Sequence, residues 1–152
     1  MKNINEDELN LSLMLEIAKF QKSAIAVFMP SIRKSGLTLP QANILMRLYH
    51  EKRPLSVNEL IDLTISSSGN TDVVINNLIK SGLILKKQDL KDKRKRLIEL
   101  TEAGLIKAAA EYQEHQVILN KVLSPFSREQ KESLFSEFIK LSESVEENFQ
   151  NR

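Results

Sequence analysis

The sequence of 152 residues has no cysteine and only four glycines, four prolines and two histidines. Without cysteine, the chain cannot form a disulfide framework, a thiol-based redox sensor or a thiolate metal site. So few glycines and prolines leave little room for long loops, and the many Leu, Ile, Glu, Lys and Ala residues favour helices. The sequence therefore predicts a mainly α-helical protein with a small proportion of other structure.

Membrane spans, secretion signals and catalytic motifs are also missing. No apolar run approaches membrane-spanning length, and the acidic start MKNINEDELN has no signal-peptide core. We therefore expect a cytoplasmic protein with no membrane partner. There is no phosphate-binding glycine loop, HExxH motif, nucleophile elbow or cysteine–histidine pair, and His50 and His115 alone give little support to a zinc site. These absences predict a protein that is not an enzyme and has no metal or cofactor.

Basic residues are concentrated in the middle of the chain. Residues 33–107 hold 14 Lys and Arg against 8 Asp and Glu, whereas the rest hold 8 against 12. The densest segment, 86–96 (KKQDLKDKRKR), has seven Lys and Arg in eleven residues. A basic centre between acidic ends indicates a surface for a polyanion such as DNA.

Hydrophobic periodicity predicts long helices at both ends of the chain. Apolar residues three and four apart predict helices over 7–29, 102–123 and 128–149. Pro30 and Gly36 are expected to close the first of them. Their apolar stripes exceed what one small domain needs for its own core, so a second copy of the chain is the simplest partner.

Shorter helices are predicted between these ends. Thr38-Leu39-Pro40-Gln41 is typical of a helix start, and the helix should end near His50. Ser56-Val57-Asn58-Glu59 is a capping box that opens a helix over about 57–63, and another helix is expected from about Ser67 to Lys80. Two short helices joined by a tight turn form a helix-turn-helix.

Two strands, 82–86 and 96–100, follow these helices and place the basic segment at the tip of a β-hairpin. The predicted fold class is therefore mainly α with a small β-hairpin wing: a winged helix-turn-helix flanked by N- and C-terminal helices. We expect a single domain, 1–152, with the winged helix-turn-helix at 37–101 and dimerisation helices at 5–36 and 102–152.

The winged helix suggests how the basic segment would work. The second short helix has the size to enter the major groove, while the wing neutralises phosphates or enters a minor groove. Candidate recognition-helix contacts are Ser67, Ser68, Asn70, Thr71 and Asn76; candidate wing contacts are Lys91, Asp92, Lys93, Arg94, Lys95 and Arg96. Ser56 is expected to lie near a phosphate at its helix start. Asp89 and Asp92 are expected to pair with Arg and fix the wing tip.

Candidate dimerisation residues lie on the terminal stripes: Leu9, Leu13, Ile17, Leu134, Phe138, Leu141 and Val145. Two other kinds of function stay open at this point. One is a nonspecific architectural DNA-binding protein, and the other is a winged-helix adaptor that binds proteins. Sequence preference on DNA distinguishes the first from a regulator, and insensitivity to loss of wing charge identifies the second.

The run from Leu37 to Gly104 resembles the MarR (multiple antibiotic resistance regulator) family of bacterial transcription factors. The family pattern in the wing is Asp, any residue, Arg, then an apolar strand ending in Leu-Thr-x-x-Gly. This sequence supplies it with Asp92, Arg94, Leu97, Ile98, Leu100, Thr101 and Gly104.

The resemblance implies a homodimer whose two recognition helices bind a pseudo-palindromic operator in double-stranded DNA. It also implies that Arg94 enters the minor groove, that Asp92 helps to hold the wing, and that the protein is a repressor responding to a small amphipathic or aromatic effector. One departure concerns Asp72-Val73, where many members have Thr-Arg. Asp72 either faces away from DNA or reads a cytosine amino group.

Overall fold

The computed structural model describes residues 4–63, 68–89, 92–93 and 95–150, with the side chains at 63, 68–70 and 150 left aside. The chain divides into two compact units, 1–115 and 116–152. This division lies inside a helix, and the predicted change of role between residues 101 and 102 stays a prediction.

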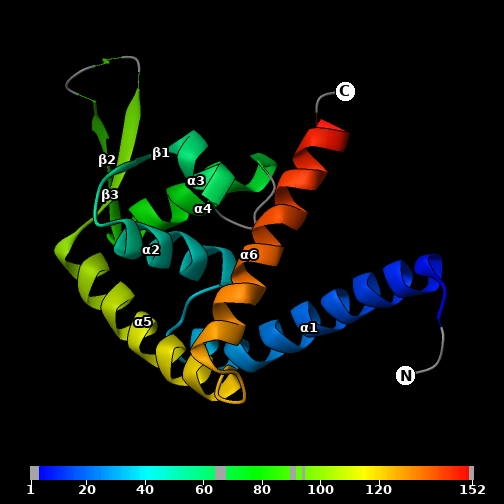
Figure 1. Cartoon of the computed structure of the whole chain (residues 1–152). Helices are drawn as coiled ribbons and strands as arrows, with labels where there is room; N and C mark the ends of the chain where they lie inside the picture. Colours follow the sequence, from blue (N-terminus) through cyan, green and yellow to red (C-terminus); the bar gives the residue numbers. More distant parts are fainter. Residues whose placement is uncertain (1–3, 64–67, 90–91, 94, 151–152) are drawn as a thin grey trace. The chain divides into compact units, whose positions relative to one another are not determined.

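The elements follow the predicted order (Figure 1). They are α1 (Glu6–Lys34), α2 (Leu39–Glu51), β1 (Leu55–Ser56), α3 (Val57–Leu63), α4 (Ser68–Lys80), β2 (Ile84–Gln88), β3 (Arg96–Leu100), α5 (Glu102–Val122), α6 (Arg128–Val145) and a π-helical turn, η1 (Glu146–Gln150). The strands form an antiparallel sheet in the order β1-β3-β2. This arrangement confirms the mainly α fold class with a β-hairpin wing.

Helix α1 is longer than predicted, because Pro30 lies inside it rather than at its end. The helix continues to Lys34, and Gly36, with φ of 75°, provides the left-handed turn that follows. A proline in a helix interior removes one hydrogen bond. That cost is offset because continuing the helix brings Ile32 into the core, where it is fully buried.

The core of the first unit lies between α2, α3, α4 and the sheet. Its fully buried side chains come from each of these elements: Ile44, Leu45, Leu55, Leu60, Leu78 and Ile98. Gly82, with φ of 71°, ends α4, and its N–H donates to the carbonyl oxygen of Ile79. Leu83 closes the same turn on Leu78, so β2 begins at Ile84 rather than at Gly82 as predicted.

The part of α5 in the first unit packs with its hydrophobic periodicity, with one exception. The periodicity of this helix predicts Leu105 and Ala108 on its buried side; Ala108 is buried, whereas Leu105 is 51% exposed. Gly104, Glu111 and His115 are buried as well. The ring of His115 stacks on Phe28 at a centroid distance of 4.7 Å, and its Nδ1 donates to the carbonyl oxygen of Glu111. Small side chains at 104 and 108 let the helix approach closely, and a one-residue shift of phase then exposes Leu105.

The second unit contains the end of α5, α6 and η1. Ser127 and Gln130 cap α6 reciprocally, with the Ser127 N–H donating to Gln130 Oε1 at 2.8 Å. The α-helix ends at Val145, and η1 covers the rest of the predicted span. None of the described residues of α6 is buried. Within the described part of the chain, no helix is long and apolar enough to cross a membrane.

Candidate nucleic-acid interface

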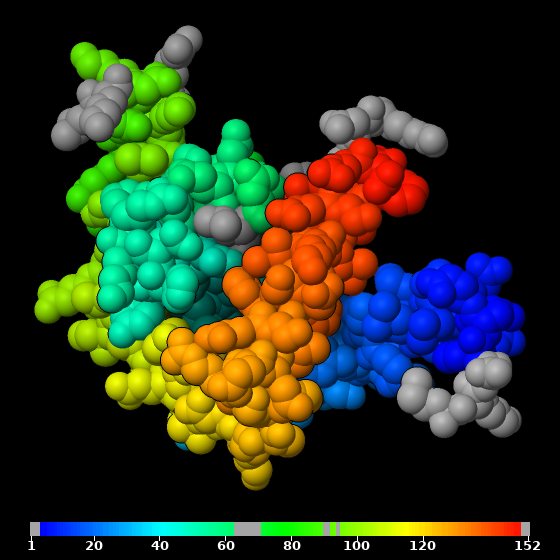
Figure 2. Space-filling view, in the orientation of Figure 1, coloured from blue at the N-terminus to red at the C-terminus, as the bar shows by residue number. Residues whose placement is uncertain are grey.

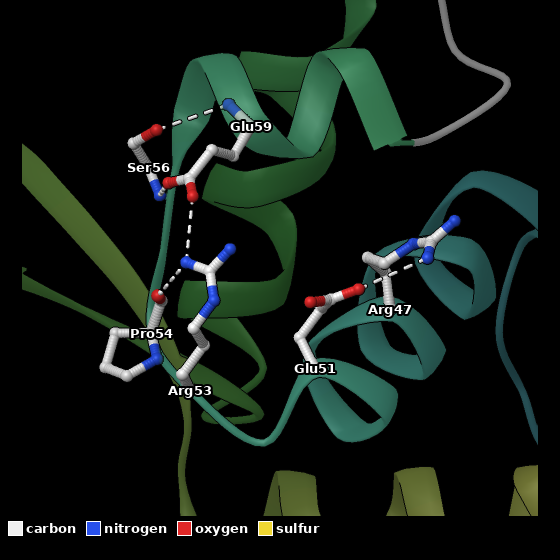
Figure 3. Close-up of polar contacts among 6 residues, drawn as sticks. All are labelled: Arg47, Glu51, Arg53, Pro54, Ser56 and Glu59. Carbon is white, nitrogen blue, oxygen red and sulfur yellow. Dashed lines mark hydrogen bonds and ion pairs between the residues drawn. The ribbon is translucent and has the colours of Figure 1, made fainter.

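The start of α3 is built by a capping box. The hydroxyl of Ser56 accepts the N–H of Glu59 at 3.2 Å, and the Glu59 carboxylate accepts the N–H of Ser56 at 2.7 Å (Figure 3). Two N–H groups that the helix leaves without partners are thereby satisfied. The predicted cap is confirmed, whereas the proximity of Ser56 to a phosphate stays a prediction.

Arg53 extends this cap toward the preceding turn. Its Nη1 donates to Glu59 Oε1 at 2.8 Å and to the carbonyl oxygen of Pro54 at 3.3 Å (Figure 3). Three groups lower the pKa of Glu59 from 4.5 to about 2: the Ser56 N–H has the largest effect, and the Ser56 hydroxyl and Arg53 have smaller ones. Arg53 was not among the predicted site residues. An arginine six residues before a capping glutamate is too weak a pattern to identify such a bridge from sequence.

Helix α4 turns one polar face to solvent. Val74, Ile75 and Leu78 are buried and hold the helix on the core. The exposed residues on the other side are Asp72, Val73, Asn76, Asn77 and Lys80. We define these five residues as the recognition face.

The prediction for Thr71 is wrong, because its side chain is only 1% exposed. It lies on the same side of α4 as Ile75 and Leu78, four and seven residues further along the helix, and therefore packs inward. Ser67 and the side chains of Ser68 and Asn70 lie outside the described part of the chain. Of the predicted contacts on this helix, Asn76 is on the recognition face.

The wing is an antiparallel hairpin that projects beyond the neighbouring helices α3 and α4 (Figures 1 and 2). Its base pairs Ile84 with Leu100 and its outer end pairs Gln88 with Arg96. Lys87, on β2, forms an ion pair with Glu99 on the adjacent strand. The buried Ile84 and Ile98 attach the hairpin to the core, so the polar residues beyond them extend into solvent.

Backbone contacts shape the tip of the wing. The N–H of Asp89 donates to the carbonyl oxygen of Lys95 at 3.1 Å. The N–H of Lys95 donates to the carbonyl oxygen of Asp92 at 2.8 Å. The Gln88 side chain donates to the carbonyl oxygen of Lys93 at 2.6 Å. These bonds leave Lys93, Lys95 and Arg96 exposed. Lys91 and Arg94 lie outside the described residues, and the pairing of Asp89 and Asp92 with Arg stays a prediction.

A groove of about 780 Å³ connects the three parts. It is lined by Ser56 and Glu59 at the cap, by Asp72 on α4, and by Lys86, Lys95 and Arg96 on the wing. Residues separated by up to 40 positions in the sequence therefore share one surface. Among the described residues, no three potential metal-ligating side chains converge.

The Leu-Thr-x-x-Gly motif joins the wing to α5. The hydroxyl of Thr101 donates to the carbonyl oxygen of Gly82 at 2.6 Å and accepts the N–H of Gly104 at 3.0 Å. The Thr101 N–H donates to the carbonyl oxygen of Leu83 at 3.1 Å. A Cβ on Gly104 would lie 1.8 Å from that same oxygen, so only glycine permits this approach. The motif fixes the base of the wing.

Comparisons with known proteins agree with this architecture. Residues 26–110, more than half of the chain, match the family model described as transcriptional regulator SarA/Rot. A probable transcriptional regulator from Pseudomonas aeruginosa is 28% identical, with a TM-score of 0.71, over 88% of this chain and 98% of that one. No match was found among the curated proteins.

Two further solved structures share the fold. A putative MarR family regulator from Listeria monocytogenes, solved with 26mer DNA, is 22% identical, with a TM-score of 0.79, over 97% of this chain and 92% of that one. The organohalide-sensing regulator RdhR, in its 2,4-dichlorophenol-bound form, is 20% identical, with a TM-score of 0.75, over 95% and 88%. The resemblance to MarR regulators seen in the sequence is confirmed.

Proposed function

This chain belongs to the SarA/Rot family of transcriptional regulators, and we propose that it regulates promoters by binding double-stranded DNA through α4 and the wing. The observation that supports this proposal is the shared groove, which is lined by the α3 cap, by Asp72 of the recognition face, and by Lys86, Lys95 and Arg96 of the wing. A helix of this size fits the major groove, and the wing cations would contact the phosphates beside it.

The wing would supply most of the affinity. Lys93, Lys95 and Arg96 are exposed at its tip or outer end, and each phosphate contact releases counterions from DNA. Arg94 is proposed to enter a minor groove, where the negative potential is greatest. Ser56 is proposed to lie near a phosphate, because the N-terminus of a helix favours anions.

The chain is proposed to act as a homodimer on a pseudo-palindromic operator. The supporting observation is the exposed apolar surface of the terminal helices: Leu9 is 46% exposed, Leu13 53% and Phe138 46%. Leu134, Leu141 and Val145 are also exposed, and Ile17 is half-buried. Two-fold symmetry of the protein would match two half-sites about one helical turn apart.

We also propose repression that is relieved by a small amphipathic or aromatic effector. A cavity of about 450 Å³ in the first unit combines apolar walls, from Leu48, Tyr49, Leu100 and Leu105, with charged walls of both signs, from Lys52, Arg53 and Glu99. RdhR, with a similar fold, was solved with 2,4-dichlorophenol. A ligand with a ring and a polar substituent would fit the mixture of walls in this cavity.

The test of wing-mediated binding is the salt dependence of affinity. Replacing Lys93, Lys95 and Arg96 with alanine should weaken DNA binding and flatten the slope of log K against log salt by roughly 2–3, since each phosphate contact contributes about 0.9. Fluorescence anisotropy titrations between about 0.05 and 0.2 M salt would measure both values.

The matched control replaces Lys22, Lys121 and Lys131, which are exposed cations outside the winged helix. It removes the same charge, so the general effect of charge on affinity can be subtracted. Equal slopes for the wing variant and the unsubstituted chain would contradict the assigned role of the wing.

A further inference from the structure

The recognition face has an unusual chemistry for a surface that approaches phosphates. Among its five residues, Asp72 carries a negative charge and the only cation is Lys80, at the C-terminal end of α4. Between them lie Val73, which is 55% exposed, and the two amides Asn76 and Asn77. Asp72 has no hydrogen-bond or ion-pair partner among the residues that the structure describes, although it lines the groove together with wing cations. A free carboxylate so placed reduces affinity for DNA unless it meets a donor there.

The donors that the major groove offers are few. A carboxylate can only accept hydrogen bonds. Guanine presents the acceptors N7 and O6, and thymine presents O4, so both repel it. Adenine offers an amino group, but its N7 acceptor lies beside that donor. Cytosine offers an amino donor without a neighbouring acceptor, and is therefore the base that best satisfies Asp72.

The other exposed residues favour A·T pairs. Asparagine can donate to N7 and accept from the amino group of adenine, which fits Asn76 and Asn77. The methyl groups of Val73 match the thymine methyl group. No arginine occurs on the recognition face, and arginine makes the commonest specific contact to guanine.

The spacing of these residues fits successive base pairs. Positions 72 and 73 are four residues from 76 and 77, which is roughly 6 Å along a helix that rises 1.5 Å per residue. Base pairs are stacked about 3.4 Å apart along each strand. The two pairs of side chains are therefore separated by roughly two base-pair steps.

We propose that the recognition face reads an A·T-rich half-site in which Asp72 accepts a hydrogen bond from the amino group of one cytosine. In this half-site Val73 contacts an adjacent thymine methyl group, and Asn76 and Asn77 contact adenines roughly two steps further on. The proposal rests on the proposed DNA-binding function and adds the sequence that the protein prefers.

The experiment is a binding-site selection from random duplex DNA with the full chain and with Asp72→Asn. The unsubstituted chain should enrich A·T-rich half-sites with one invariant C·G pair. Replacing that pair with T·A should weaken its binding about 10-fold, because one good base contact discriminates by that order. Asp72→Asn should lose the preference at this position alone, or prefer adenine there, while the other positions are unchanged.

A second measurement isolates Val73. Replacing the thymines of the enriched site with deoxyuridine removes only the methyl groups. Binding of the unsubstituted chain should weaken severalfold, whereas Val73→Ala should lose most of this sensitivity. Glu143→Gln, which removes one exposed carboxylate from α6, controls for the general effect of charge on affinity and should keep the preferences of the unsubstituted chain.

The outcomes separate the two proposals. If the unsubstituted chain enriches no sequence, the proposed function fails and this inference fails with it. If it enriches a sequence whose preferences Asp72→Asn leaves unchanged at every position, the function stands and the inference is overturned. An invariant guanine-specific contact that disappears on substituting Asn76 or Asn77, with no role for Asp72, would also overturn it.

Discussion

Glu59 shows how one side chain can tie a helix start to the surrounding turn. Its carboxylate accepts the Ser56 N–H and the Arg53 guanidinium, and its pKa lies near 2 instead of 4.5. Because the pKa in the folded state is below that in the unfolded state, the charge stabilises the fold above about pH 4.5. This stabilisation is lost as the pH falls toward 2.

We expect Glu59→Gln to lower the free energy of unfolding at neutral pH by about 1 kcal/mol, a value that allows for solvent screening of a partly exposed side chain. The difference from the unsubstituted chain should shrink as the pH is lowered from 4.5 toward 2. Urea unfolding across this pH range would measure it, with Glu143→Gln as the charge control. A difference that stays constant with pH would show that the charge of Glu59 contributes nothing.

At the scale of elements, the junction between α5 and the wing depends on Gly104. Helix propensity alone predicts that Gly104→Ala stabilises α5 by about 1 kcal/mol. The structure predicts the opposite sign, because the added Cβ would lie 1.8 Å from the carbonyl oxygen of Leu83. We expect a loss of about 1–3 kcal/mol, since helix and strand must move apart.

Thermal or urea unfolding would decide the sign of this change. Ala110→Gly, at an exposed position of the same helix, measures the difference between glycine and alanine where no backbone lies close. A stabilising Gly104→Ala would mean that the helix approaches Leu83 less closely than the structure shows. The same displacement should weaken DNA binding, because Thr101 and Gly104 hold the base of the wing.

The elements that sequence predicts well are those with local chemical signals. The capping boxes at Thr38, Ser56 and Ser127 each involve residues three positions apart, so their partners are visible in the sequence. The strand at 96–100 was likewise predicted from alternation and confirmed. The prediction that Pro30 ends the first helix is wrong. The tendency of proline to end a helix is outweighed by burial of Ile32, which is a tertiary effect.

The candidate site was predictable in type but less so in its individual residues. The basic segment and the short helix identify a winged helix, whereas the side of α4 that faces solvent depends on how the helix packs. Thr71 is polar and close to the helix start, yet it lies on the buried side. Asn77 and Val73 belong to the exposed side, and one residue of rotational phase decides between these outcomes.

At the scale of the whole molecule, the C-terminal helix α6 leaves apolar side chains exposed to water, which costs free energy unless a partner covers them. Helix α6 has no buried residue among those described, and even its large apolar side chains are exposed: Phe135 by 69% and Phe138 by 46%. Monomeric proteins rarely leave large contiguous apolar patches in water. A homodimer would bury this surface. Deletion of residues 128–152 should therefore abolish the dimer.

A sharper test keeps the chain at full length. Replacing Phe138 and Leu141 with glutamate should give a monomer, because association would bury unpaired charges. The control, Ser136→Glu with Lys140→Gln, lowers the net charge by the same two units. It acts on the other side of α6, since each residue advances the helix by about 100°. Sedimentation equilibrium should show a monomer for the first variant and a dimer for the second, with equal helix content by circular dichroism.

The monomer should also bind a full pseudo-palindrome no more tightly than a single half-site, because its two contacts are no longer linked. A dimer that survives both glutamates would place the interface elsewhere on the chain.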